Sequence, residues 1–265
     1  MVCDSHKAFQ AGQTILKIQD VSFFYGRKQV LDSVSFDITA GRLCGLLGPN
    51  GSGKTTLFKC CLGFFKTTAG RILLGDKPLS QYTSKHLAAH VAYVPQEHQP
   101  AFPYSVREMV EMGRTPHRGA LPVLSKTDHH AVEHALERVG LRALADEPFT
   151  HLSGGQRQLV LVARALAQEA ALMFLDEPTA SLDFSNQLIV WETVRDIAAQ
   201  GLGVVICCHD PNHILWFCDD VAALKNGHLL ATGPAAETLT RKLLETLYDR
   251  PIHTAETGSR VFIYP

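Results

Sequence analysis

The feature that most constrains this chain is a short glycine-rich segment between an apolar run and a helix-forming stretch. Residues 43–47 read Leu-Cys-Gly-Leu-Leu, which is typical of a strand buried on both faces, and residues 54–62 favour a helix. Residues 48–55, between them, match the pattern G-x-x-x-x-G-K-[ST]. In this setting the backbone N–H groups close around a phosphate, so we predict a phosphate-binding loop rather than a simple tight turn.

The residues of this loop have distinct predicted roles. Lys54 reaches the terminal phosphates of a nucleotide, and the hydroxyl of Thr55 is a ligand for Mg²⁺. The predicted cofactors are therefore ATP and Mg²⁺. The residues expected to surround the phosphates are Gly48, Pro49, Asn50, Gly51, Ser52, Gly53, Lys54, Thr55 and Thr56.

A second apolar run ends in two adjacent carboxylates. Residues 171–175 read as a buried strand, and Asp176 and Glu177 follow directly. A strand that delivers Asp176 to the metal leaves Glu177 facing the terminal phosphate, where it can act as a general base. Taken alone, Asp-Glu-Pro could equally be a turn that starts a helix, but beside a phosphate loop we favour the catalytic role.

The order of the predicted elements indicates an α/β fold with an antiparallel β edge. Apolar and aromatic residues between 15 and 38 predict antiparallel strands, and the later chain alternates strand and helix, which implies a parallel sheet. The further predicted strands are residues 91–94, 171–175 and 203–208, with a helix at 185–199 and a hairpin over 221–231 that turns at Asn226-Gly227.

The stretch between these strands is expected to be a helical insertion. Helical patterns cover residues 105–113 and 127–139, and no strand pattern interrupts them. We therefore predict a single domain over residues 1–265, with a nucleotide-binding core at 1–96 and 169–265 and a helical subdomain at 97–168.

Composition excludes several classes of protein. The net charge is −1, so the chain offers no basic field for nucleic acid. Seven cysteines without a C-x-x-C pair favour buried thiols in a reducing compartment. No apolar run is long enough to span a bilayer, so we expect that any function at a membrane requires docking to another subunit.

One more motif identifies the family that the chain resembles. Leu152 is followed by Ser153, Gly154, Gly155 and Gln156, and a long helical stretch comes next, which makes a second helix N-terminus able to bind phosphate. A bare helix cap would explain this motif on its own. The phosphate loop, Leu-Ser-Gly-Gly-Gln and Asp-Glu-Pro in this order, however, resemble the ATP-binding cassette family over nearly the whole chain.

The resemblance implies roles for further residues and a homodimer. Tyr25 matches the aromatic that stacks on adenine, and Gln96 matches the glutamine that senses Mg²⁺ and the transport subunit. His209 matches the histidine at the γ-phosphate, so the implied catalytic residues are Glu177, His209 and Lys54, and the implied Mg²⁺ ligands are Thr55, Gln96 and Asp176. Asp183 lies in the loop expected to cross the dimer interface, and Ser153 and Gly155 of one chain would close over ATP held by Lys54 of the other. Considered singly, Tyr25 and His209 are more often packing residues.

Within the family, residues 102–108 and 113–117 look like the subgroup that powers uptake of iron–siderophores, haem, cobalamin or molybdate. The pattern departs from this subgroup at residues 210–213. The resemblance implies a permease docked between Gln96 and His117, an extracytoplasmic solute-binding protein, and a place at the cytoplasmic face of the inner membrane. No regulatory domain is expected after the last predicted strand, and the transported solute cannot be read from this chain.

Other functions remain as alternatives. A cassette ATPase of DNA repair or translation would fit the same motifs, but the chain has one phosphate loop, no heptad run and no basic patch. A regulator that does not hydrolyse nucleotide would be expected to lack Glu177 or His209. Two histidine pairs with i,i+4 spacing, His86/His90 and His130/His134, could begin a zinc site, but we favour solvated helix faces.

Overall fold

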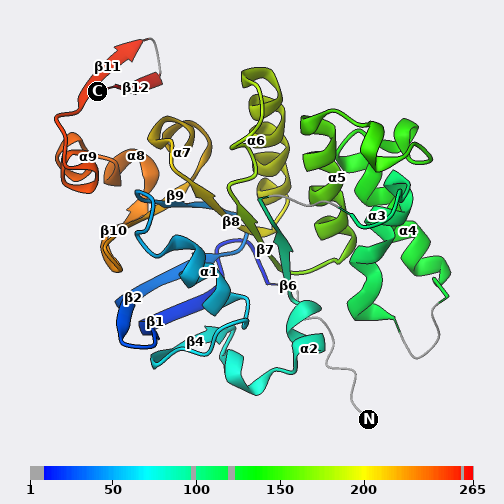
Figure 1. The fold of residues 1–265 in the computed structure, drawn as a ribbon, viewed down its shortest axis with the longest axis horizontal. Helices are drawn as coiled ribbons and strands as arrows, with labels where there is room; N and C mark the ends of the chain where they lie inside the picture. The colour runs from blue at the N-terminus through cyan, green and yellow to red at the C-terminus, as the bar shows by residue number, and fades with distance from the viewer. Residues whose placement is uncertain (1–8, 97–99, 119–122, 258–259, 265) are drawn as a thin grey trace.

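The computed structural model describes residues 9–96, 100–118, 123–257 and 260–264. A six-stranded sheet with the order β10-β9-β3-β8-β7-β6 forms its centre (Figure 1). The strands from β9 to β6 are parallel, and β10 pairs with β9 in the antiparallel sense. Their bounds are β3 (Leu43–Leu47), β6 (Val91–Val94), β7 (Leu172–Asp176), β8 (Gly203–Cys208), β9 (Asp220–Lys225) and β10 (His228–Pro234).

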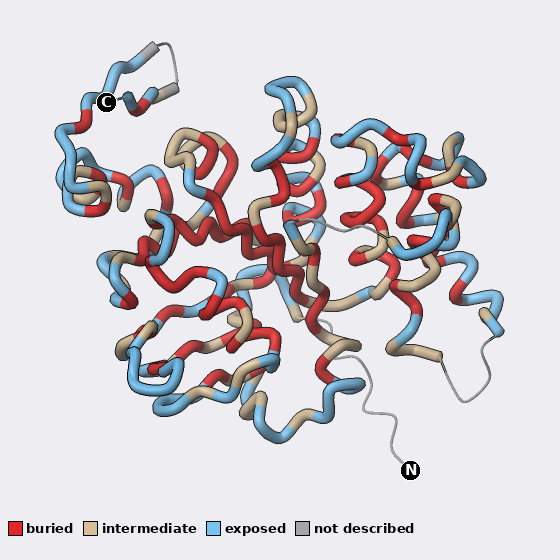
Figure 2. Tube along the Cα trace, viewed as in Figure 1, coloured by how far each residue is buried: buried red, intermediate tan, exposed pale blue. Residues whose placement is uncertain are grey.

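Both faces of the parallel part of this sheet are buried, as its continuous apolar runs predicted, whereas β10 is exposed or half-buried. Leu43 and Leu47 of β3 point into one hydrophobic core, and Cys44 and Leu46 point into the other. The central strands therefore form a continuous buried layer (Figure 2). This burial fixes the strand register, because a shift by one residue would exchange the two faces.

A separate four-stranded antiparallel sheet with the order β2-β1-β4-β5 packs across one core. Its strands are β1 (Thr14–Tyr25), β2 (Lys28–Thr39), β4 (Ala69–Leu74) and β5 (Lys77–Pro78). Strands β1 and β2 confirm the predicted antiparallel β region. Helix α1 (Lys54–Cys61) contributes its buried side chains to the same core.

Three helices, α3 (Val106–Glu111), α4 (Lys126–Arg138) and α5 (Gly154–Ala167), pack on one another at the far side of the sheet from β10 (Figure 1). Each begins with a capping box, in which a serine side chain and a residue three positions later bond each other's backbone N–H. The pairs are Ser105 with Glu108, Ser125 with Asp128, and Ser153 with Gln156. Short 3₁₀ turns cover Leu79–Gln81, Met112–His117, Arg142–Leu144 and Phe149–His151, and the short helix α2 (Ser84–Ala88) precedes β6.

The end of the chain contains more structure than the sequence predicted. Helix α6 (Phe184–Ala199) was expected, but α7 (Pro211–Phe217) was not, because Pro211 reads as a break although proline is favoured at the first helical position. No prediction from the sequence covered the elements that follow the hairpin at residues 221–231. Two short helices and a hairpin follow β10: α8 (Ala235–Thr238), α9 (Arg241–Tyr248), β11 (His253–Thr257) and β12 (Arg260–Tyr264).

Two further findings concern the described part of the chain as a whole. None of its helices is long and apolar enough to cross a bilayer. The cysteines among the described residues are all buried and free.

Candidate active site

A cleft of about 570 Å³ opens between the predicted phosphate loop and the end of the antiparallel sheet, a size within the usual range for ligand pockets. Most of the loop residues proposed from the sequence line it, together with Glu177. The lining residues are Tyr25, Lys28, Gln29, Val30, Asn50, Gly51, Ser52, Gly53, Lys54, Thr55, Thr56, Glu177 and Asn226.

Lys54 begins α1, and its ammonium group turns back into the loop. The side chain is buried, and Nζ donates to the carbonyl oxygens of Gly48 at 2.7 Å and Pro49 at 3.2 Å. A buried ammonium requires such partners, since an unpaired charge is costly. This geometry holds one cation at the centre of the loop, which is where negatively charged phosphates would be bound.

Two glycines let the loop lie this close to its neighbours. A Cβ added at Gly48 would lie 2.1 Å from the carbonyl oxygen of Leu224, and Gly53 has a φ of +106°. The Asn226-Gly227 turn of the β9–β10 hairpin supports the loop from outside, because the N–H of Gly227 donates to the carbonyl of Ser52 at 3.0 Å. Both turn residues have positive φ, as predicted for this hairpin.

Asp176 ends β7 with its carboxylate buried. The Tyr93 hydroxyl donates to it at 3.5 Å, and burial, followed by the charge of Glu177, raises the pKa of Asp176. A carboxyl whose charge is disfavoured in this way gains stability from a nearby cation. Thr55 leaves its hydroxyl exposed at the start of α1, so an oxygen ligand is free there.

Carboxylate and hydroxyl oxygens are the ligands that Mg²⁺ prefers, so Asp176 and Thr55 fit this ion, which also takes phosphate oxygens and waters. The described residues contain no cluster of three or more His, Cys, Asp or Glu side chains suited to a metal. The buried hydroxyl of Ser52 has no hydrogen-bond partner in the described part of the chain, which marks the cradle as adapted to a ligand.

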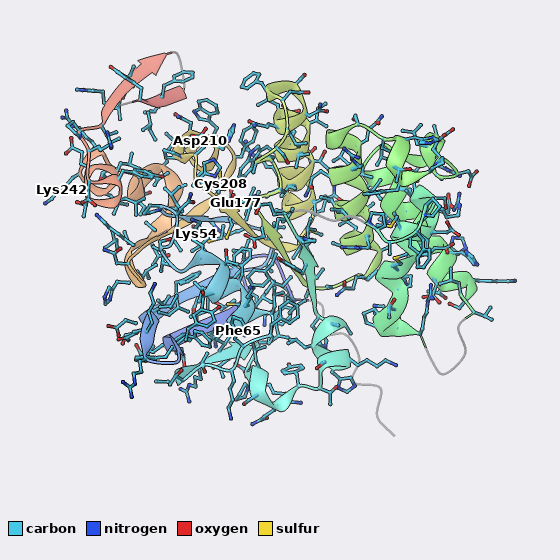
Figure 3. The ribbon with its side chains drawn as sticks, viewed as in Figure 1. Lys54, Phe65, Glu177, Cys208, Asp210 and Lys242 are labelled. Atoms are coloured by element: carbon cyan, nitrogen blue, oxygen red, sulfur yellow. The ribbon has the colours of Figure 1, made fainter. Side chains whose placement is uncertain are left out.

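Glu177 and His209 face each other at the carboxyl ends of neighbouring strands. Nδ1 of His209 lies 3.8 Å from Oε2 of Glu177, and the Glu177 side chain is 22% exposed. The backbone of Glu177 has φ +45°, a conformation uncommon outside glycine and often found at functional sites. Figure 3 labels Glu177 and its surroundings, with Cys208 and Asp210 flanking His209 in the sequence and Lys54 below.

Tyr25 ends β1 at the rim of the cleft and is 47% exposed. It also contacts the rings of Phe23 and Phe65 edge-on, with centroids 5.0 and 5.7 Å apart. The side chain thus both packs against neighbouring rings and presents ring surface to the cleft. The two interpretations from the sequence, a packing residue and an aromatic that stacks on adenine, therefore do not exclude each other.

The Leu-Ser-Gly-Gly-Gln motif does not join the cleft of its own chain. Ser153 caps α5, accepting from the N–H of Gln156 at 3.3 Å, while Gln156 accepts from the N–H of Ser153 at 3.0 Å. A Cβ on Gly155 would come within 2.3 Å of the Asn186 side chain on α6, so this glycine permits close packing of the two helices. Asp183 caps α6 and accepts from Asn186.

Gln96 lies just after β6, exposed, beside a second cavity of about 510 Å³. This cavity is formed mainly by the three-helix layer and the segment after β7; Gly154 and Ser181 are among its other lining residues. The structure therefore places Gln96 beside that layer rather than on the wall of the phosphate cleft.

Sequence reasoning missed several residues of the cleft wall. Lys28, Gln29 and Val30 start β2, and Asn226 was recognised only as part of a turn. Their position depends on strand pairing between distant segments, so no local pattern could have placed them there. Ser52 was found through the motif.

Two charged residues of the segment expected to dock a permease make contacts within the chain. Arg107 pairs with Glu133 and lies 3.4 Å from a carboxylate oxygen of Asp146, and Glu108 completes the cap of α3. Arg114 is buried in ion pairs with Asp128 and Glu169 at 2.7 and 2.6 Å. These three residues of the segment resembling the uptake subgroup stabilise the helical layer.

Comparison with known proteins supplies the family context. The family model described as ABC transporter matches residues 31–180. The hemin import ATP-binding protein HmuV of Thermobifida fusca is 38% identical, covering 90% of this chain and 83% of its own length. A probable iron chelatin transport ATP-binding protein of Helicobacter pylori is 34% identical, covering 94% of this chain and 99% of its own.

A solved structure agrees with these sequence relatives. A metal-chelate type ABC transporter in an inward-facing conformation matches with a TM-score of 0.82 and 33% identity, over 95% of this chain and 96% of that one. The comparisons give no support to a cassette ATPase that acts in DNA repair or translation.

Proposed function

The chain belongs to the ABC transporter family of ATP-binding subunits, and from that premise we propose that it drives import of a metal chelate across a membrane. As a member of this family it binds and hydrolyses ATP. The observation that carries the site assignment is that Glu177, which lies 3.8 Å from His209, lines the same cleft as Lys54.

Each residue has a role that follows from its position. Lys54 and the loop N–H groups bind the phosphates, and Tyr25 stacks on the base. Asp176 and Thr55 would hold Mg²⁺, which would supply positive charge against the phosphates. Glu177 accepts the proton of the attacking water, and His209 contacts the terminal phosphate and orients Glu177.

We propose that the complete site needs a second copy of the chain. Ser153 lies outside the cleft of its own chain, at the exposed N-terminus of α5 with its free N–H groups and partial positive charge. In a head-to-tail homodimer, Ser153 and Gly155 of one copy would close over ATP bound by the other. Asp183, exposed at the start of α6, would lie at that interface.

A permease would dock on the three-helix layer, in the region from Gln96 to His117. Phe102 supports this, since its ring is 63% exposed on an otherwise well-packed layer and contacts only Tyr104 among the described aromatic rings. On this proposal the core comprises residues 1–96 and 169–265 and the helical subdomain 97–168. The subunit works at the cytoplasmic face of the membrane with an extracytoplasmic solute-binding protein.

The docking surface is tested by Phe102→Ala. We expect basal ATP hydrolysis to persist while stimulation by the co-purified permease is lost. Val123, which is 76% exposed and lies outside the region from Gln96 to His117, provides the control through Val123→Ala. Equal stimulation of both variants would place the permease elsewhere.

Transport itself is tested by uptake in cells that lack this chain. Radiolabelled haem, ferric siderophore, cobalamin and molybdate would be compared in cells complemented with the wild type or with Glu177→Gln. We expect uptake of one of the metal chelates to return only with the wild type. Normal uptake of every solute in the deleted strain would contradict the proposed function.

A further inference from the structure

The C-terminal helix and hairpin are attached to the segment that carries His209. Helix α9 and the strands β11 and β12 lie on the α7 side of the central sheet (Figure 1). The family match ends at residue 180, well before this segment, so the match assigns it no role. Strand β12 packs against α7, which begins two residues after His209, and α9 packs against β9 and β10.

Helix α7 and strand β12 are joined by side chains that bond to backbone groups. The amide of Asn212 both donates to the carbonyl of Ile263 at 3.0 Å and accepts from its N–H at 2.8 Å. One turn later, the indole N–H of Trp216 donates to the carbonyl of Val261 at 2.9 Å, and its ring lies 5.2 Å from that of Phe262. Asn212 stands where the sequence departs from the usual subgroup pattern, and the structure shows that it serves this attachment.

Tyr248, the last residue of α9, reaches His209 directly. Its hydroxyl donates to the carbonyl oxygen of His209 at 3.0 Å. Burial, followed by smaller electrostatic contributions from Cys208 and Asp210, raises the pKa of Tyr248, so the phenol keeps its proton and remains a donor.

The position of Tyr248 is itself fixed. Leu244 and Leu247 bury the inner face of α9, with 0% and 1% exposed. Just after the helix, the carboxylate of Asp249 pairs with Nζ of Lys225 at 2.6 Å, which ties this end of α9 to the end of β9. These contacts fix α9, and they therefore hold the Tyr248 hydroxyl beside the carbonyl oxygen of His209.

Among the described residues, the His209 side chain is 58% exposed and lies 3.8 Å from Glu177, so its orientation depends on the backbone that carries it. The next residue, Asp210, caps α7 by accepting from the N–H of Asn212 at 2.8 Å, and its own N–H donates to the sulfur of Cys208 at 3.3 Å. A rotation of the peptide between His209 and Asp210 would turn the imidazole away from Glu177. The bond from Tyr248 to the carbonyl of this peptide opposes that rotation.

We infer that Tyr248 is a positioning residue for His209, and that the packing of α9 holds Tyr248 in place. This inference rests on the proposed role of His209 in ATP hydrolysis. Tyr248 does not touch the nucleotide on this account, so it should affect the rate of hydrolysis and leave nucleotide affinity unchanged.

The test is a double-mutant cycle on the full chain with Tyr248→Phe, which removes only the hydroxyl, and His209→Ala. A net hydrogen bond is worth about 0.5–1.5 kcal/mol, so Tyr248→Phe should lower kcat about 2- to 10-fold. The KM for ATP should stay the same, and Tyr248→Phe should have no further effect once His209 is alanine. Tyr264→Phe is the matched control, because the Tyr264 hydroxyl makes no hydrogen bond among the described residues, and it should leave kcat unchanged.

Hydrolysis rates are expressed per mole of bound nucleotide, so that unfolded protein, which binds none, does not lower the measured kcat. The inference is overturned if Tyr248→Phe leaves kcat unchanged, or if its effect is as large without His209 as with it. Failure of the proposed function is seen separately, because His209→Ala would then hydrolyse ATP as fast as the wild type, and the inference would fall with it.

Discussion

Lys54 places a buried cation inside the phosphate loop. Its ammonium group is held by two backbone carbonyls, those of Gly48 and Pro49. Phosphate oxygens are stronger partners for an ammonium group than neutral carbonyls, because such hydrogen bonds join two charges. The loop is thus organised around one cation, and the sequence motif located that cation correctly within the fold.

Replacing this cation should weaken nucleotide binding. We expect Lys54→Ala to cost roughly 1.5–3 kcal/mol of MgATP affinity, or about 10- to 150-fold, the value of a hydrogen bond between charged groups. Isothermal titration calorimetry measures the effect, with Lys77→Ala as the control, since Nζ of Lys77 lies over the ring of Tyr82 instead. Unchanged affinity in Lys54→Ala would remove the loop from the nucleotide site.

Tyr25 should contribute to ATP binding through its ring. We expect Tyr25→Ala to weaken ATP binding by roughly 1–3 kcal/mol, because a base stacked on an aromatic ring is worth about this much. Tyr25→Phe keeps the ring and should bind ATP like the wild type. Fluorescent-nucleotide titration distinguishes the two, and if Tyr25→Ala binds normally, the ring serves only to pack against Phe23 and Phe65.

At the scale of whole elements, the sequence predicted the segments whose own pattern is strong and missed those whose stability comes from distant partners. The runs at residues 43–47, 171–175 and 203–208 are apolar throughout and could only be buried strands. Strand β4 was missed because three of its six residues are exposed and pairing with β1 defines it. Helix α9 is only eight residues long and depends on its contacts with β9 and β10.

The three-helix layer contains a buried ion pair that should make its stability depend on pH. Side-chain hydrogen bonding to Ser125 and then Arg114 outweighs burial and lowers the pKa of Asp128. A carboxyl with a lowered pKa in the folded state stabilises the fold above its unfolded pKa of about 3.9, and this contribution is lost as the pH falls toward the folded value.

Asp128→Asn should therefore be destabilised near neutral pH, and the difference from the wild type should shrink as the pH falls below about 4. Breaking the pair from the other side, Arg114→Ala should cost about 3–5 kcal/mol, because it leaves a buried charge unpaired. Urea unfolding at a series of pH values measures both, with Lys17→Ala as the control for the exposed pair of Lys17 and Asp76. A difference between wild type and Asp128→Asn that did not change with pH would contradict this role of Asp128.

On the scale of the whole molecule, one chain carries two proposed phosphate-binding ends that it does not bring together. Lys54 lies at the base of the cleft, whereas Ser153 caps α5 in the helical layer. The sequence could reveal both motifs, but their separation follows from the packing of the helical layer beside β6 and α6, which no local pattern determines. This separation is why the proposed site requires two copies of the chain.

The measurement that tests this account most directly is the oligomeric state of the Glu177→Gln variant with and without MgATP. Glutamine cannot accept the proton of the attacking water, and loss of a general base typically slows hydrolysis by about 10²–10⁴-fold, so ATP should persist between two copies. Sedimentation velocity should show a monomer without nucleotide and a dimer with MgATP.

A second substitution, made at Ser153 in the Glu177→Gln variant, tests whether this residue closes the site. Aspartate and asparagine both cap helices as well as serine, so α5 should remain intact in either variant, but only aspartate brings a negative charge toward the phosphates. We predict that Glu177→Gln combined with Ser153→Asp stays monomeric in MgATP, while the combination with Ser153→Asn retains more of the dimer. A protein that remains a monomer throughout, or a dimer that responds to neither nucleotide nor the charge at residue 153, would contradict the shared site.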